Sequence, residues 1–161
     1  MAFSINRARP DQAGLIFSLI CELAEYEKLS HEVKATEAGI AAALFGDEPR
    51  LFCEIAEWNG EPAGFAVWFF NFSTFSGRSG IYLEDLFVRP PFRGKGIGKA
   101  LLSYLARLSI ENGWSRMQWT VLDWNTPSID FYKSLGAVMM DEWKLCGVSG
   151  PALAQLAKAV P

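Results

Sequence analysis

Apolar and polar positions follow two different periods along the first fifty residues. Residues 3–8 alternate as a short strand does, and Pro10 then stands where a helix can begin, because a first-turn residue needs no amide hydrogen. Apolar residues recur at helical spacing as far as Leu23, and Thr36 is suited to cap a second helix, which ends at Gly46. We therefore expect one strand followed by two helices.

The period changes in the middle of the chain. Two segments rich in aromatic residues, 51–58 and 62–72, flank Asn59-Gly60, a dipeptide that is a strong short-range signal for a β-hairpin. A loop of glycine and serine residues then leads into a further strand-like segment, 81–88. The pattern predicts an antiparallel pair followed by another strand.

Helix-like and strand-like segments alternate in the second half of the chain. We expect helices over 97–112 and 128–136, strands over 117–122 and 137–148, and a terminal helix within 150–159. Strands that alternate with helices here and run consecutively in the middle predict an α/β fold, with helices on both faces of a mixed central sheet of about six to seven strands.

The length and composition agree with one globular domain. The chain has 161 residues, of which half are hydrophobic and a fifth are charged, so we expect a single domain over residues 1–161. The net charge of −3 argues against a nucleic-acid surface. The sequence contains no signal-peptide pattern and no apolar run long enough for a membrane span, so we expect a cytoplasmic protein.

The three cysteines, Cys21, Cys53 and Cys146, are widely spaced among apolar neighbours. An odd count with this spacing predicts buried free thiols, and neither a disulfide framework nor a metal site.

A strand that runs into a glycine-rich turn and a long helix carries the chemistry. Glycines at positions 94, 96 and 98 let the backbone approach a ligand closely, and the N-terminus of the following helix favours an anion. The segment therefore predicts a cradle for phosphate, with cationic side chains at its rim: Arg93, Lys95 and Lys99.

Two common phosphate motifs do not fit this turn. A P-loop requires a glycine where Arg93 stands and a magnesium-binding hydroxyl where Ala100 stands. The dinucleotide fingerprint requires a longer last interval than Gly94, Gly96 and Gly98 provide. Kinase, ATPase and hydride-transfer functions are therefore disfavoured.

The pattern Arg/Gln-x-x-Gly-x-Gly/Ala does fit, through Arg93, Gly96 and Gly98, and here the sequence resembles the GNAT acetyltransferase superfamily. Residues 123–137 resemble the second signature of that family, a strand end followed by Asn and a helix with Phe-Tyr. The resemblance implies an acetyltransferase whose glycine turn holds the pyrophosphate of acetyl-CoA.

Residues 82–88, residues 22–27 and Trp143 resemble the spermidine/spermine N-acetyltransferase branch, which includes thialysine acetyltransferases. The resemblance implies that a primary amine of a small cationic substrate attacks the acetyl group directly. The substrate is expected to be a polyamine, thialysine or a lysine-like compound. The resemblance also implies a homodimer. Polyamine enzymes of this branch carry an acid in the loop before the Tyr-Leu-Glu-Asp strand, whereas residues 71–80 contain none. This difference favours a smaller amine, such as a lysine analogue.

Acetylation requires a neutral amine, but an amine with a pKa near 10.4 is only about 0.04 % deprotonated at pH 7. Glu84, at a strand end beside the turn, is the candidate base, directly or through a water; otherwise it fixes a neighbouring loop. Asp85 can line the same pocket only if a β-bulge intervenes, because consecutive strand residues point to opposite faces. Tyr132 is the candidate acid for the departing CoA thiolate, or else it packs beneath the sheet.

The resemblance also assigns binding roles. The expected cofactor-binding residues are Leu86, Phe87, Val88, Arg93, Gly94, Lys95, Gly96, Ile97, Gly98, Lys99, Asn125, Ser128 and Tyr132. The expected amine-binding residues are Tyr26, Glu27, Glu84, Asp85 and Trp143, in which carboxylates and aromatic faces attract an ammonium.

Two other readings stay open from the sequence. The first is a non-catalytic acyl-CoA-binding module, and the second is a GNAT enzyme that acetylates protein lysines or N-termini. The aromatic segment 69–75 is more typical of core or of a dimer contact than of a ligand site.

Overall fold

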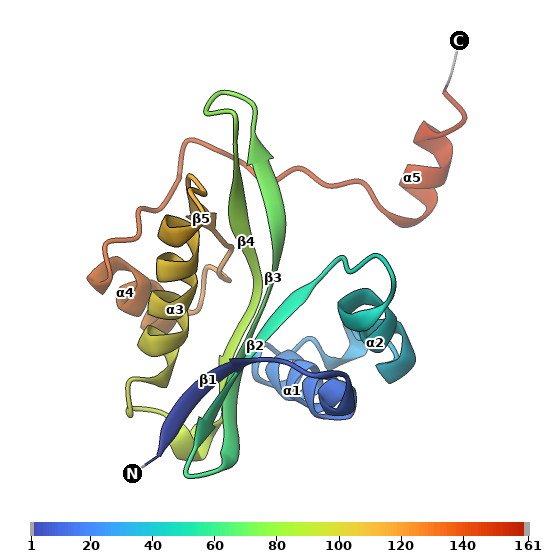
Figure 1. Ribbon diagram of the computed structural model, residues 1–161. Helices are drawn as coiled ribbons and strands as arrows, with labels where there is room; N and C mark the ends of the chain where they lie inside the picture. The colour runs from blue at the N-terminus through green and yellow to red at the C-terminus, as the bar shows by residue number, and fades with distance from the viewer. Residues whose placement is uncertain (1, 160–161) are drawn as a thin grey trace. The chain divides into compact units, whose positions relative to one another are not determined.

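The computed structural model describes residues 2–159, which form two compact units that meet in sequence between Thr120 and Val121. The first unit holds the sheet and most of the helices (Figure 1). The second contains the helices α4 and α5.

A mixed five-stranded sheet, in the order β1-β2-β3-β4-β5, organises the first unit. Neighbouring strands are antiparallel except for β4 and β5, which are parallel. The strands are β1 (Phe3–Arg7), β2 (Phe52–Trp58), β3 (Glu61–Ser73), β4 (Arg78–Val88) and β5 (Met117–Gln118). The α/β class and the mixed sheet are confirmed, although the described residues form five strands where six to seven were expected.

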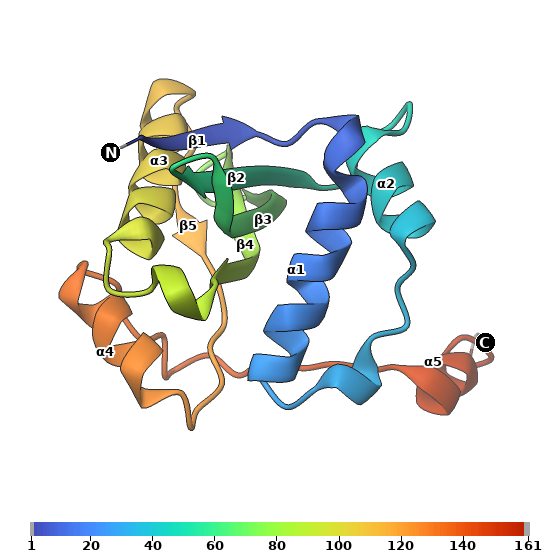
Figure 2. The same ribbon diagram turned by 90° about the horizontal axis from the view of Figure 1, so that it is seen from below.

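Helices cover both faces of this sheet (Figures 1 and 2). The α1 and α2 helices lie on one face, and α3 lies on the other. The α-helices are α1 (Ala13–Tyr26), α2 (Glu37–Phe45) and α3 (Ile97–Glu111), and the short 3-10 helices are η1 (Pro10–Gln12), η2 (Ser30–Glu32) and η3 (Pro90–Phe92).

The ends of these elements follow the predicted local signals. The Thr36 hydroxyl accepts a hydrogen bond from the Gly39 amide at 3.1 Å, which caps α2, and Gly46 ends that helix. In the β2–β3 turn, Asn59 and Gly60 have φ values of 51° and 81°, the left-handed geometry that a two-residue hairpin turn requires. The caps and the hairpin are therefore confirmed.

The buried core on the α1 side joins two helices to three strands. Apolar residues at helical spacing on α1 pack against residues that alternate along β2, β3 and β4. The cluster consists of Ala8, Ile16, Leu19, Leu23, Leu44, Cys53, Ile55, Phe65, Val67 and Phe87.

The strands expected in the last third of the chain are corrected. The strand predicted over 117–122 is limited to Met117–Gln118, and no strand covers 137–148. Two acids and a lysine between positions 141 and 144 interrupt the apolar alternation of the second segment. A strand also needs a ladder of hydrogen bonds to a neighbour, which composition alone does not supply.

The second unit contains two of the predicted helices, α4 (Thr126–Ser134) and α5 (Gly150–Leu156). Pro127 and Pro151 stand in their first turns, where a missing amide hydrogen costs nothing. That residues 1–161 form a single domain stays a prediction.

The cysteines are free, as predicted, but they are not all buried. Cys53 is buried and Cys21 is partly buried. Cys146 is exposed, as are the residues on either side of it. Burial raises the pKa of the Cys53 thiol, with the charge of Glu54 as the second cause, so this thiol is held in its neutral form.

Candidate active site

The glycine turn before α3 is open and points amides outward. Gly94 and Gly96 have φ values of 75° and 80°, and a Cβ added to either would meet no atom within 4 Å. The first hydrogen bond of α3 runs from the Ala100 amide to the Gly96 carbonyl, at 2.9 Å. The amides of residues 97–99 precede this bond, so they are directed out of the helix end, where a diphosphate group fits.

The cations at this turn lie against aromatic rings of the same unit. Arg93 Nε donates to the Val88 carbonyl at 2.9 Å, and its guanidinium carbon lies 4.8 Å from the centre of the Tyr26 ring. Lys95 Nζ lies 5.2 Å from the centre of the Trp58 ring. These exposed side chains are therefore held near the turn by cation–π contacts.

The strand that leads to the turn contains the bulge on which the expected pocket depends. Asp85 pairs with Val67 and Leu83 pairs with Trp68, so Glu84 is an extra residue without a partner in the ladder. A bulge re-aims side chains, and the condition for Glu84 and Asp85 to share a pocket is therefore met. Glu84 is exposed and Asp85 is partly buried.

After Tyr82, one edge of β4 has no paired strand among the described residues. Within residues 2–159, β5 pairs with β4 only at Ile81 and Tyr82. From Leu83 to Val88 the edge that faces away from β3 therefore has no strand against it. Backbone groups on such an edge can bond to an extended ligand, as the expected pantetheine contacts of Leu86, Phe87 and Val88 require.

The carboxylate of Glu27, at the C-terminal end of α1, lies near two carboxylates of β4. Burial raises the pKa of Asp85 to about 7, and the charges of Glu84 and then Glu27 add to this effect. Burial also raises the pKa of Glu27, which directly follows α1. Beside them, the rings of Tyr26 and Phe87 lie 6.4 Å apart. The structure thus brings together the expected amine-binding residues of the first unit.

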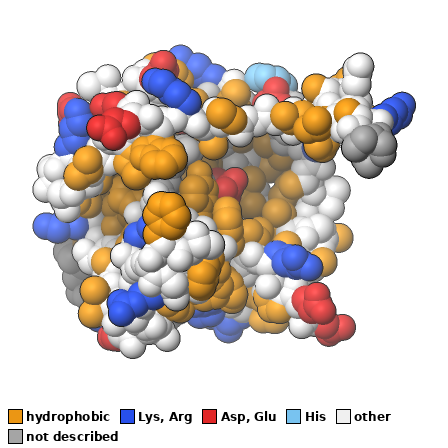
Figure 3. Space-filling view, turned by 90° about the horizontal axis from the view of Figure 1, so that it is seen from above, with side chains coloured by type: hydrophobic (Ala, Val, Ile, Leu, Met, Phe, Trp, Pro, Cys, Tyr) orange, Lys and Arg blue, Asp and Glu red, His pale blue; other side chains and the backbone are white. Residues whose placement is uncertain are grey.

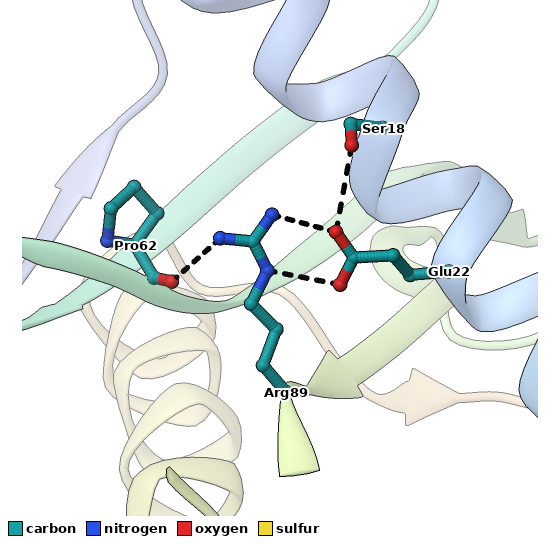
Figure 4. A network of polar contacts seen from close by, with 4 residues as sticks. All are labelled: Ser18, Glu22, Pro62 and Arg89. Atoms are coloured by element: carbon teal, nitrogen blue, oxygen red, sulfur yellow. Dashed lines mark hydrogen bonds and ion pairs between the residues drawn. The ribbon is translucent and has the colours of Figure 1, made fainter. Parts of the chain in front are cut away.

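An ion pair that the sequence did not indicate fixes the end of α1 to the end of β4 (Figure 4). Glu22 accepts two hydrogen bonds from Arg89, at 2.6 and 2.9 Å, and Arg89 also donates to the Pro62 carbonyl at 3.1 Å. Both side chains of this pair are partly buried. Only the tertiary fold, and no local motif, brings these two residues together.

The remaining expected residues lie in the second unit. Asn125 is buried and caps α4, with its side-chain oxygen accepting from the Ser128 amide at 3.4 Å. Tyr132 lies partly buried on α4, with its ring 5.5 Å from that of Phe131. Trp143 is 75 % exposed, in a segment outside the helices and strands. The roles of these residues stay predictions.

Comparisons with known proteins agree with this geometry. Residues 16–137 match the family described as Acetyltransferase (GNAT) family. The chain is 41 % identical to a thialysine N-epsilon-acetyltransferase of Bos taurus over 98 % of its own length and 99 % of that protein. It is 31 % identical to an L-ornithine N5-acetyltransferase of Arabidopsis thaliana, over 96 % of the chain and 87 % of that protein.

Among solved structures, an integron cassette protein from V. cholerae matches with a TM-score of 0.81 and 30 % identity, over 99 % of both chains. The expected resemblance to the branch with thialysine acetyltransferases is confirmed. The chain therefore belongs to the acetyltransferase (GNAT) family, whose enzymes transfer the acetyl group of acetyl-CoA.

Proposed function

We propose that this enzyme acetylates the side-chain amine of a small basic amino acid of the lysine or ornithine type. The observation that carries the proposal is the group of neighbouring carboxylates contributed by Glu27, Glu84 and Asp85. Three acids beside the aromatic rings of Tyr26 and Phe87 suit one primary ammonium group. The names of the bovine and Arabidopsis relatives both place the acetyl group on such an amine.

The catalytic roles follow the sequence-based assignment. The amides of residues 97–99, with Arg93, Lys95 and Lys99, would hold the diphosphate of acetyl-CoA, and the edge of β4 without a paired strand would hold the pantetheine. By the sequence-based assignment, Asn125 and Ser128 would contact the cofactor, and Trp143 would contribute to amine binding. A carboxylate, with Glu84 as the candidate from sequence, takes the ammonium proton, and Tyr132 protonates the departing thiolate.

A polyamine is the second candidate substrate, and the β3–β4 hairpin argues against it. Residues 71–80, which include the tip of this hairpin, contain no acid that could bind a distant second ammonium. Protein lysines or N-termini are the remaining alternative.

An amine panel tests the proposal. Purified enzyme with acetyl-CoA is offered thialysine, lysine, ornithine, spermidine and a lysine peptide at equal concentrations, and CoA release is measured. We expect the highest kcat/KM with the amino acids. Preference for spermidine or the peptide would overturn the amino-acid assignment while leaving the acetyltransferase intact.

We also propose that the chain forms a homodimer through the β3–β4 hairpin. This hairpin extends beyond its neighbours in the first unit (Figure 1), and hydrophobic side chains are exposed on the face drawn in Figure 3. Three of its phenylalanines, Phe70, Phe72 and Phe75, are exposed by 44 %, 58 % and 104 %. Exposed aromatic groups of this size are typical of protein interfaces.

A further inference from the structure

The β-bulge gives the two adjacent acids of β4 different surroundings. Glu84 is the inserted residue and is exposed, so water surrounds its carboxylate. Asp85 stands opposite Val67, and opposed residues of an antiparallel pair lie on the same face of the sheet. Val67 belongs to the buried core beneath α1. The side chain of Asp85 therefore lies on the α1 face, at the margin of that core.

Ionisable groups from several elements surround Asp85. Glu84 precedes it on β4, and Glu27 acts on it from the end of α1. Cys53 of β2 lies on the same face, because it pairs with Val67, and burial keeps it neutral. Arg93 reaches the region from the glycine turn, with its guanidinium carbon 5.6 Å from the centre of the Phe87 ring.

This environment suits a proton acceptor. A general base works best when its pKa lies near the pH at which the enzyme operates. Burial and the two negative charges bring the pKa of Asp85 to about 7, so at neutral pH about half of the carboxyl groups are ionised. Asp85 can therefore accept a proton and return it to solvent in each turnover.

From the bulge, the facing of the side chains and the position beside the cofactor turn, we propose that Asp85 is the general base of the acetyl transfer. Glu84 and Glu27 then hold the substrate ammonium next to it. This inference rests on the proposed function, and it reassigns the proton transfer from Glu84, the candidate from sequence, to its neighbour.

The step balances without a further reactant. Asp85 takes one ammonium proton, the neutral nitrogen forms a bond to the acetyl carbonyl carbon, and the bond from that carbon to sulfur breaks. The thiolate takes a proton from the hydroxyl of Tyr132. The nitrogen then gives its second proton to the Tyr132 oxygen, which restores the hydroxyl. The third proton stays on the amide, and Asp85 releases its own to solvent.

The matched variants Asp85→Asn and Glu84→Gln test the inference. For each, kcat/KM for thialysine with acetyl-CoA is measured from about pH 5.5 to about pH 9.5. CoA affinity and melting temperature, measured on the same samples, show whether each variant is folded and binds the cofactor.

For the wild type, kcat/KM should rise with pH and bend near pH 7. Asp85→Asn should lower it about 100-fold at neutral pH and remove the bend, so that the rate rises only toward the pKa of the amine itself. Glu84→Gln should raise KM for thialysine by no more than about tenfold and keep the bend.

If Asp85→Asn keeps the bend and Glu84→Gln loses it, the inference is overturned and Glu84 is the base. If both variants keep it, neither carboxylate is the base and the inference is equally overturned. A wild type that binds CoA but acetylates no amine would refute the proposed function, and the role of Asp85 with it.

Discussion

At the scale of single residues, the carboxyl of Asp85 should make the stability of the protein depend on pH. Burial raises its pKa from 3.8 to about 7, so folding favours its neutral form. The stability that this provides is complete below pH 3.8 and is lost as the pH rises through 7. Asp85→Asn removes the cost of ionisation and should therefore stabilise the protein more at pH 8 than at pH 5, by about 2–3 kcal/mol.

Urea denaturation of wild type and variant at the two pH values measures this difference. Glu84→Gln is the control, since it removes only the electrostatic influence of an exposed neighbour and should show a smaller change. An equal effect of Asp85→Asn at both pH values would mean that Asp85 is ionised throughout.

Tyr132 carries the second prediction at this scale. Tyr132→Phe removes the hydroxyl that is proposed to protonate the CoA thiolate, and it keeps a ring that can pack on α4. We expect kcat to fall about 100-fold while CoA affinity, measured by calorimetry, stays within about twofold of wild type. Phe131→Leu, which changes the adjacent ring without removing a hydroxyl, serves as the control. Unchanged turnover of Tyr132→Phe would refute the acid role.

At the scale of elements, the ion pair of Glu22 and Arg89 should control how the end of α1 meets β4. Tyr26 and Glu27 follow Glu22 by about one helical turn, so a loosened α1 would displace them. Glu22→Gln replaces a two-point charged contact with a weaker one, and it should cost about 1–2 kcal/mol of unfolding free energy. It should also raise KM for the amine more than KM for acetyl-CoA.

Steady-state kinetics and thermal unfolding check this expectation. Glu25→Gln is the matched control, because Glu25 lies on the same helix and is exposed. If the two variants behave alike, the ion pair does not position the pocket.

The elements that the sequence predicted well are those encoded by neighbouring residues. The Thr36 cap, the Asn59-Gly60 turn and the apolar stripes of α1 and α3 each depend on residues a few positions apart. The glycine turn could be found for the same reason. Its φ values and its open space are local properties of Gly94 and Gly96.

Features that depend on distant residues could not be predicted in this way. The bulge at Glu84 becomes visible only in the register of β4 against β3, and the pairing of Glu22 with Arg89 joins residues 67 positions apart. The raised pKa of Asp85 requires burial and the approach of Glu27. The absence of a strand over 137–148 likewise depends on tertiary hydrogen bonding that alternation cannot specify.

At the scale of the whole molecule, aromatic residues of β3 pack with rings of β2 and of the segment after α3. The rings of Phe52, Trp68, Phe70 and Trp114 contact one another at centre distances of 4.6 to 5.7 Å, and Trp68 is buried among them. Further along β3, Phe72 is exposed. A twofold contact between two β3–β4 hairpins would bury this exposed surface, and twofold dimers are the commonest oligomers.

The last prediction concerns this contact. Wild type should elute at twice the mass of one 17.9 kDa chain in size-exclusion chromatography with light scattering. The double variant Phe72→Ser and Phe75→Ser should shift toward the monomer, because the proposed contact loses most of its exposed aromatic area. Ile110→Ser, on an apolar residue of α3 that is 81 % exposed, should leave the mass unchanged. A monomeric wild type would rule out the homodimer, and an equal shift caused by Ile110→Ser would place the contact elsewhere.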